Sequence, residues 1–284
     1  MNKLPFVLLG LAFARMACAA LHTDIEYGRA GGESLKLDAY VPDGAGPFPT
    51  VILVHGGGWT AGDKSGGPRK ALIAPMQEPL ARAGFAWFSI NYRLAPQHPY
   101  PACIDDVETA IRWVKAHAAE YRLDPQRIAL SGESAGGHLV ALAAVRADER
   151  TRLAAIVPFY APSDLAGRVN PGEPLPANYV ALFGRTTADE SALALLRAAS
   201  PLSYVKPGLP PFLLVHGNAD ARVPYDQSTK FQAKLRAAGV RCDLLTIEGG
   251  GHGMAGWATV APDYQERVVA WLVETLALRE SKAQ

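Results

Sequence analysis

Three polar residues, two of them in glycine-rich patterns, have the side chains needed for nucleophilic catalysis. Ser134 is the centre of a G-E-S-A-G pattern at 132–136, His252 lies in a G-G-G-H-G pattern at 249–253, and Asp220 lies between them along the chain. A serine hydroxyl is a weak nucleophile and needs a base, and an imidazole base needs a carboxylate to orient it. We therefore predict Ser134 as nucleophile, His252 as general base and Asp220 as the acid that holds His252.

Other residues could compete for these roles. Ser134 could instead act only as the cap of a helix. Among the seven histidines, His55 is expected to support a loop and His138 to be packed one helical turn after Ser134. Asp164 is the second candidate for the acid, whereas Asp226 is expected to be a solvated helix residue.

A second glycine-rich pattern, H-G-G-G-W at 55–59, follows an apolar run. Three successive glycines leave backbone N–H groups uncovered by side chains, and such groups can converge on an oxygen that becomes negative during acyl transfer. The N–H of Ala135, the residue after the expected nucleophile, is placed to add a further donor. The alternative is a glycine-rich turn that binds nothing.

The elements expected to position these residues are short apolar strands alternating with helices. Expected strands after residue 50 cover 50–54, 85–92, 127–131, 153–160, 213–217 and 242–247. Expected helices between and after them cover 77–83, 102 to about 121, 138–144, 224–238 and 262 to about 278. This alternation predicts an α/β fold with a mostly parallel central sheet and helices on both faces. Sites in such sheets lie beyond the carboxyl ends of the strands, where all the candidate residues fall.

The remaining segments set the domain organisation. Residues 23–28 and 34–41 predict an edge hairpin, with Gly31 and Gly32 in the turn. Residues from about 165 to 204 contain no strand pattern but two short helical stretches, 178–184 and 189–199. We predict a small cap insertion there, over the carboxyl ends of the strands. Residues 20–284 are expected to form a single domain.

The N-terminal residues have the features of a secretory signal peptide. Lys3 precedes an apolar run over 4–13, and an Ala-Cys-Ala sequence ends at Ala19. The run is too short to span a bilayer, so we predict cleavage after Ala19 and a secreted or periplasmic protein. The alternatives are a cytoplasmic protein with an apolar first strand and a lipid anchor on Cys18. The sequence leaves open whether Cys103 and Cys242 pair.

The composition of the chain limits the classes of partner that can be expected. The chain has 284 residues, 49% hydrophobic and 19% charged, with a formal net charge of +1, as is typical of a globular protein with a sizeable core. This charge balance gives no electrostatic reason to expect nucleic acid or an anionic membrane as partner. No cofactor and no metal site are expected, because Cys103 and Cys242 lack neighbouring ligands at metal-binding spacing. The oligomeric state is left open.

These patterns resemble the esterase/lipase branch of the α/β-hydrolases that is related to hormone-sensitive lipase. Within it the chain is most similar to the secreted carbohydrate esterases, the feruloyl and acetyl-xylan group. The matching stretches are 55–59 with 62–64, 92–96 with 101–102 and Asp105, 132–138, 199–201, 216–220 with 223–224, and 251–253. The resemblance implies an α/β-hydrolase fold with Ser134, Asp220 and His252 as catalytic residues. It also implies that Gly57, Gly58 and Ala135 donate N–H groups to the oxyanion.

The function expected from the resemblance is hydrolysis of short-chain or aryl acyl esters, on small molecules or plant-wall carbohydrates. An amide-bond hydrolase, similar to formamidases or to oligopeptidase catalytic domains, is the alternative on the same fold. A non-catalytic module that binds a small molecule is a third possibility, although here all three expected catalytic residues are present. The cap insertion matches the family least, so the resemblance leaves the substrate open.

Overall fold

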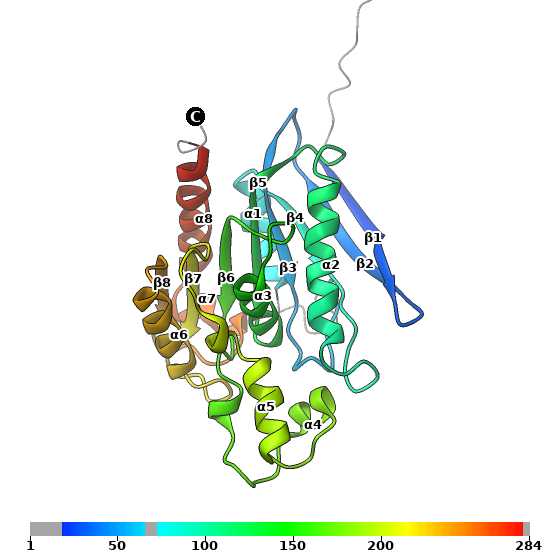
Figure 1. The fold of residues 1–284 in the computed structure, drawn as a ribbon. Coiled ribbons are helices and arrows are strands. Elements are labelled where there is room, and N and C mark those ends of the chain that lie inside the picture. Colours follow the sequence, from blue (N-terminus) through cyan, green and yellow to red (C-terminus); the bar gives the residue numbers. More distant parts are fainter. Residues whose placement is uncertain (1–18, 66–72, 281–284) are drawn as a thin grey trace, which may run out of the picture.

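The computed structural model describes residues 19–65 and 73–280, which contain an eight-stranded sheet (Figure 1). Its strand order is β1-β2-β4-β3-β5-β6-β7-β8. Residues 1–18 of the expected signal peptide, including Cys18, lie outside the described residues.

Five of the six parallel strands lie side by side and form the centre and one edge of the sheet. They are β3 (Phe48–Val54), β5 (Leu123–Glu133), β6 (Ala155–Phe159), β7 (Phe212–Gly217) and β8 (Cys242–Ile247). Strand β4 (Ala86–Ile90) pairs parallel with β3 and antiparallel with β2. The hairpin of β1 (Ala20–Ala30) and β2 (Glu33–Val41) completes the other edge, as predicted. The predicted mostly parallel α/β sheet is confirmed.

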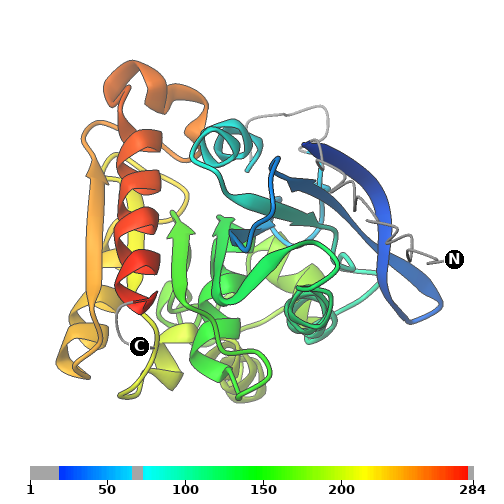
Figure 2. The same cartoon turned by 90° about the horizontal axis from the view of Figure 1, so that it is seen from above.

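Helices cover both faces of the sheet, which is why the central strands contain continuous apolar runs rather than alternating apolar and polar residues. Along β3, Ile52 and Val54 contribute to one hydrophobic core, and Val51 and Leu53 to the other. The first core is covered by α2 (Ala102–Ala116), α3 (Ala135–Arg146) and α6 (Asp226–Ala237). The second is covered by α1 (Gln77–Arg82) and α8 (Tyr264–Glu280). Figure 2 shows α1 and α2 on opposite sides of the twisted sheet.

Some predicted boundaries were wrong by a few residues. Helix α2 ends at Ala116 rather than near Tyr121, because the chain leaves helical geometry at His117 (φ −98°, ψ 13°) and the next N–H, of Ala118, bonds only three residues back, to the Lys115 carbonyl at 3.4 Å. Strand β5 starts at Leu123, before the apolar run that predicted it.

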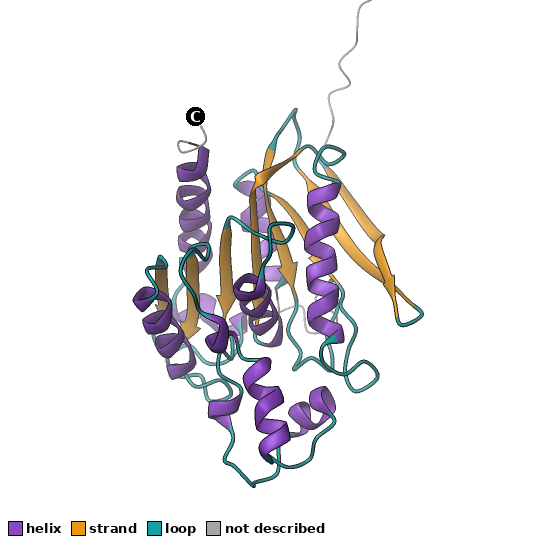
Figure 3. Cartoon of the chain, in the orientation of Figure 1, coloured by secondary structure: helices purple, strands orange, loops and turns teal. Residues whose placement is uncertain are grey.

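The predicted cap insertion contains two short helices, α4 (Ala177–Phe183) and α5 (Glu190–Ala198). Two 3₁₀ turns, η3 (Ala166–Arg168) and η4 (Pro201–Tyr204), flank them. In Figures 1 and 3 these elements lie at the end of the molecule toward which the arrows of the parallel strands point. The cap, residues 165–204, therefore lies at the end of the sheet where the candidate site was expected. The remaining short elements are η2 (Ala74–Met76), η5 (Met254–Gly256) and α7 (Trp257–Val260).

Candidate active site

Ser134 occupies the sharp turn between β5 and α3. Its backbone has φ 52° and ψ −115°, a conformation that is costly for a residue with a Cβ atom. The Ser134 N–H donates to the Phe159 carbonyl at 2.9 Å, which ties the turn to β6. Helix α3 can approach β3 closely because residue 136 is a glycine. A Cβ atom at this position would lie only 2.2 Å from the Val54 carbonyl oxygen, which is too close. The Ser134 hydroxyl makes no capping bond to α3, so the alternative of a serine that only caps a helix is wrong.

The structure brings Ser134, His252 and Asp220 into one line of contacts. His252 lies in the loop after β8, and its Nε2 is 3.0 Å from the Ser134 hydroxyl oxygen. Its Nδ1 is 2.7 Å from Oδ2 of Asp220, which follows β7. Because a carboxylate only accepts, Nδ1 carries the hydrogen and Nε2 is left to accept from Ser134. The three side chains thus have the geometry that proton transfer from a nucleophilic serine requires.

Asp220 has further partners besides His252. Its Oδ1 accepts from the N–H groups of Arg222 and Val223 at 2.8 and 2.9 Å, and Nε2 of His216 lies 3.3 Å from its Oδ2. Burial alone would raise the pKa of Asp220, but the hydrogen bonds from His216, His252 and the Val223 N–H hold it well below its usual value. Asp220 is therefore a carboxylate at neutral pH. The contact with His216 was not predicted, although the spacing of four residues was visible in the sequence.

The competing candidates have other partners. Asp164 accepts from the Gly167 N–H at 2.9 Å and so stabilises the start of the cap. Asp226 forms an exposed ion pair with Lys230 at 2.6 Å. His55 supports the glycine loop, as predicted, since its Nδ1 donates to the Gly56 carbonyl at 2.7 Å. Burial lowers the pKa of His55 to about 4, which keeps its ring neutral.

The loop expected to stabilise the oxyanion, residues 55–59, is called the oxyanion loop below, and its three glycines differ in their hydrogen bonds. The N–H of Gly56 donates to the Glu133 carboxylate, so it is already engaged. Within residues 19–65 and 73–280, no acceptor takes the N–H of Gly57 or Gly58. Gly57 has φ 106°, and a Cβ atom there would lie 2.1 Å from the Ala61 carbonyl oxygen, so this turn requires glycine. The N–H of Ala135, at the start of α3, is the third expected donor.

Glu133 and Tyr160 are two buried residues of the site that the sequence analysis did not assign. Burial raises the pKa of Glu133 to about 7, although Tyr160 and the Gly56 N–H oppose the rise. The Tyr160 ring packs edge-on against the His252 ring, with 4.8 Å between centroids. Tyr160 therefore limits how the His252 ring can turn. A tyrosine at the end of an apolar strand gave no sequence signal for this contact.

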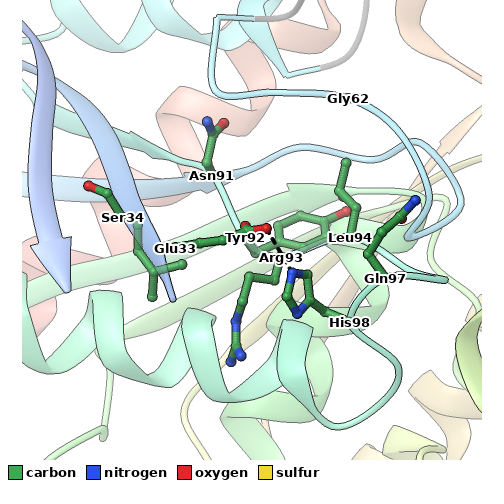
Figure 4. Close-up of a pocket in the computed structure, with 10 residues that line it drawn as sticks. Glu33, Ser34, Gly62, Asn91, Tyr92, Arg93, Leu94, Gln97 and His98 are labelled. Atoms are coloured by element: carbon green, nitrogen blue, oxygen red, sulfur yellow. Dashed lines mark hydrogen bonds and ion pairs between the residues drawn. The ribbon is translucent and has the colours of Figure 1, made fainter. Parts of the chain in front are cut away.

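A hollow of about 290 Å³ lies beside residues that support the oxyanion loop (Figure 4), and Ser134, His252 and Asp220 are not among its lining residues. Tyr92 and Arg93 form part of its wall. The Tyr92 hydroxyl donates to the His55 carbonyl at 3.1 Å. The Arg93 guanidinium forms a two-pronged ion pair with the buried Asp106, with a closest approach of 2.8 Å. The Tyr92 hydroxyl therefore supports the loop directly, whereas the Arg93–Asp106 pair ties the segment after Tyr92 to α2.

Two expectations about other segments can be compared with the structure. Cys103 and Cys242 are both buried free thiols, so they do not pair. Within the described residues, no helix is long and apolar enough to cross a membrane.

The parallel sheet, the strained serine turn and the Ser134–His252–Asp220 contacts define an α/β-hydrolase. The family model BD-FAE matches residues 37–235, and the chain belongs to this family. It is 36% identical over 234 residues to esterase LipQ of Mycobacterium tuberculosis, covering 78% of this chain and 54% of that protein. It is 32% identical over 241 residues to esterase LipI of the same organism, covering 79% and 71%.

Solved structures agree with this assignment. A truncated carbohydrate esterase from gut microbiota superposes with a TM-score of 0.78 at 27% sequence identity, covering 93% of this chain and 99% of that one. The chain spans about half the length of the first curated relatives it matches, with 54%, 51% and 53% of them covered.

Proposed function

We propose that this chain is a serine carboxylesterase that hydrolyses short-chain or aryl acyl esters, with plant-wall carbohydrates as carriers of the acyl group. The observation that carries the proposal is the unbroken line from the Ser134 hydroxyl through His252 to Asp220, with contacts of 3.0 and 2.7 Å. Beside it lie the unengaged N–H groups of Gly57 and Gly58 in the described structure. This combination is suited to acyl transfer and requires no cofactor.

The proposed reaction has two halves. Ser134 Oγ attacks the ester carbonyl carbon while its proton moves to His252 Nε2, and the carbonyl oxygen becomes an oxyanion that the N–H groups of Gly57, Gly58 and Ala135 stabilise. The intermediate then collapses, the C–O bond to the alcohol breaks, and the departing alkoxide takes the proton from Nε2. Water next attacks the acyl-enzyme with His252 again as base. The proton returns to Ser134 Oγ as the acid leaves.

The relatives support the class of reaction and suggest the substrate. Two curated relatives are named esterases, and the gut-microbiota structure is titled a carbohydrate esterase. Similarity to that structure over nearly the whole described chain is our reason for proposing acyl groups on sugars. The cap differs most from the family pattern, so we propose that it selects the acyl group.

The test is a substrate panel on the purified protein, with Ser134→Ala as control. We expect hydrolysis of p-nitrophenyl acetate, butyrate and octanoate and of feruloylated arabinose, with the short or aryl acyl groups preferred. Matched p-nitroanilides should react far more slowly. Faster cleavage of the anilides would support the amide-hydrolase alternative instead. Equal ester hydrolysis by the Ser134→Ala variant, or no hydrolysis by the wild type, would overturn the proposal.

A further inference from the structure

We propose that His138 is a positioning residue that holds the oxyanion loop against helix α3 and links it to the cap. This inference rests on the proposed esterase function. His138 lies one helical turn after Ser134, is completely buried, and has no part in the proton transfers described above. It is the one residue of α3 that bonds by side chain to both the oxyanion loop and the cap within the described structure.

The first contact of His138 is with Trp59, the last residue of the oxyanion loop. Trp59 Nε1 donates to His138 Nδ1 at 3.2 Å, and the two rings meet edge-on with 5.2 Å between centroids. The Trp59 backbone has φ 63°, a left-handed conformation that a bulky residue rarely adopts. Only 2% of Trp59 is exposed, so its indole is fixed by these contacts. Because Trp59 directly follows Gly58, an indole fixed in place anchors the end of the glycine stretch and restricts how far the loop can shift.

The second contact of His138 is with the cap. His138 Nε2 lies 2.7 Å from the carbonyl oxygen of Ala199, directly after α5. A carbonyl only accepts and an indole N–H only donates, so the hydrogen must be on Nε2 and Nδ1 must be bare. Burial lowers the pKa of His138 to about 4, which agrees with a neutral ring. The Ala199 carbonyl thus selects the one tautomer that can accept from Trp59.

The cap also reaches the oxyanion loop directly. The Tyr179 ring of α4 lies 6.0 Å from the Trp59 ring. A Cβ atom on Gly58 would lie 3.8 Å from Cβ of Asn178, the residue before Tyr179. The loop is therefore enclosed between α3 and the cap, and His138 is the hydrogen-bonded link between the two. A shift of the loop would move N–H donors away from the oxyanion, and each such donor is worth about 10²- to 10³-fold in kcat.

Two substitutions of His138 separate positioning from general stability. In His138→Asn, the amide oxygen can replace Nδ1 as acceptor for Trp59, but the bond to Ala199 is lost. In His138→Gln, the longer amide can still donate to the Ala199 carbonyl, but Trp59 loses its acceptor. Each variant loses one buried hydrogen bond, so we expect similar decreases in melting temperature. We expect kcat for p-nitrophenyl acetate to be about tenfold or more lower in His138→Gln than in His138→Asn, with KM little changed.

A second readout reports the oxyanion loop alone. A p-nitrophenyl phosphonate labels the active serine through a tetrahedral oxyanion, so its labelling rate should fall in parallel with kcat in His138→Gln. Trp59→Phe removes the same hydrogen bond from the other side and should reproduce the His138→Gln loss, with the double variant no worse than either single one. Thr50→Val removes a buried hydroxyl at the opposite end of the sheet and serves as the control with unchanged kcat.

The possible outcomes separate this inference from the proposed function. Equal kcat in His138→Gln and His138→Asn, or wild-type kcat in both, would overturn the positioning role while leaving the esterase intact. A kcat that decreases in proportion to the melting temperature across all variants would also overturn the positioning role. A wild-type protein without ester hydrolysis would overturn the proposed function, and this inference with it.

Discussion

His216 and Asp220 meet side chain to side chain at the end of β7, with His216 Nε2 3.3 Å from Asp220 Oδ2. The same carboxylate oxygen accepts from His252. His216 is completely buried, and its ring is fixed by Ser228 Oγ at 2.7 Å from Nδ1 and the Val223 carbonyl at 3.0 Å from Nε2. Asp220 therefore has a second imidazole partner, which holds the carboxylate in place whether or not His252 moves.

The first prediction concerns this second partner. Replacing His216 with leucine removes the imidazole Nε2–H that the Val223 carbonyl and the Asp220 carboxylate share, so we expect the free energy of unfolding at pH 7 to fall by about 1.5–3 kcal/mol. Activity should also fall, because Asp220 becomes less well placed for His252. Urea unfolding and ester kinetics measure the two effects. When residue 220 is already asparagine, His216→Leu should lower the free energy of unfolding by less than it does in the wild type. An equal decrease in both backgrounds would contradict an energetic coupling between His216 and Asp220.

A second prediction concerns Glu133 and pH. The folded-state pKa of Glu133 is about 7 against an ordinary value of 4.5, so the folded protein binds the proton more tightly than the unfolded chain. Stability contributed by this group is therefore greatest below pH 4.5 and is lost as the pH rises to 7. Glu133→Gln has no such titration. Its stability relative to wild type should rise by about 3 kcal/mol between pH 4.5 and 8. Urea unfolding of both proteins across this range measures the difference, and parallel curves would contradict the buried-carboxyl interpretation.

The third prediction distinguishes the two acid candidates. Asp220→Asn leaves His252 without a carboxylate to hold its Nδ1–H, so kcat should fall by about 10⁴-fold. Asp164→Asn removes an acceptor for the Gly167 N–H in the cap and should leave kcat within a few-fold of wild type. Ester hydrolysis by the two matched variants decides between the candidates. A large loss in Asp164→Asn with activity retained in Asp220→Asn would reverse our assignment.

A fourth prediction compares neighbouring glycines of the oxyanion loop. Both have positive φ, but a Cβ atom on Gly57 would collide with the Ala61 carbonyl at 2.1 Å, whereas on Gly58 the nearest atom would be 3.8 Å away. Gly57→Ala must move the loop, so we expect kcat to fall by about 10²-fold or more. Gly58→Ala meets no collision and should cost clearly less. Equal losses in the two variants would mean that backbone conformation, not crowding, limits this loop.

The arrangement of strands was predictable because the chain repeats one simple pattern. Strands such as β3, which is apolar from Val51 to Val54, contain continuous apolar runs because both faces of the sheet are covered, and they alternate with helices. The ends of helices were less predictable. Helix α2 stops at Ala116 because the backbone turns out of helical geometry at His117, and apolar periodicity, which continues to Ala118, does not reveal this change.

The sequence alone indicated which residues lie at the carboxyl edge of the sheet, because Ser134, Asp220 and His252 each follow a recognisable strand, and Ser134 and His252 lie in glycine-rich patterns. Only the tertiary structure decided which side chains touch. The edge-on packing of Tyr160 on His252, the contact of His216 with Asp220, and the link from Trp59 through His138 to Ala199 all join distant segments or depend on side-chain direction. The pattern of strands specifies on which face of the sheet and at which end of a strand a residue lies. Its hydrogen-bond partners depend on how separate elements are placed relative to one another, and only tertiary packing determines that placement.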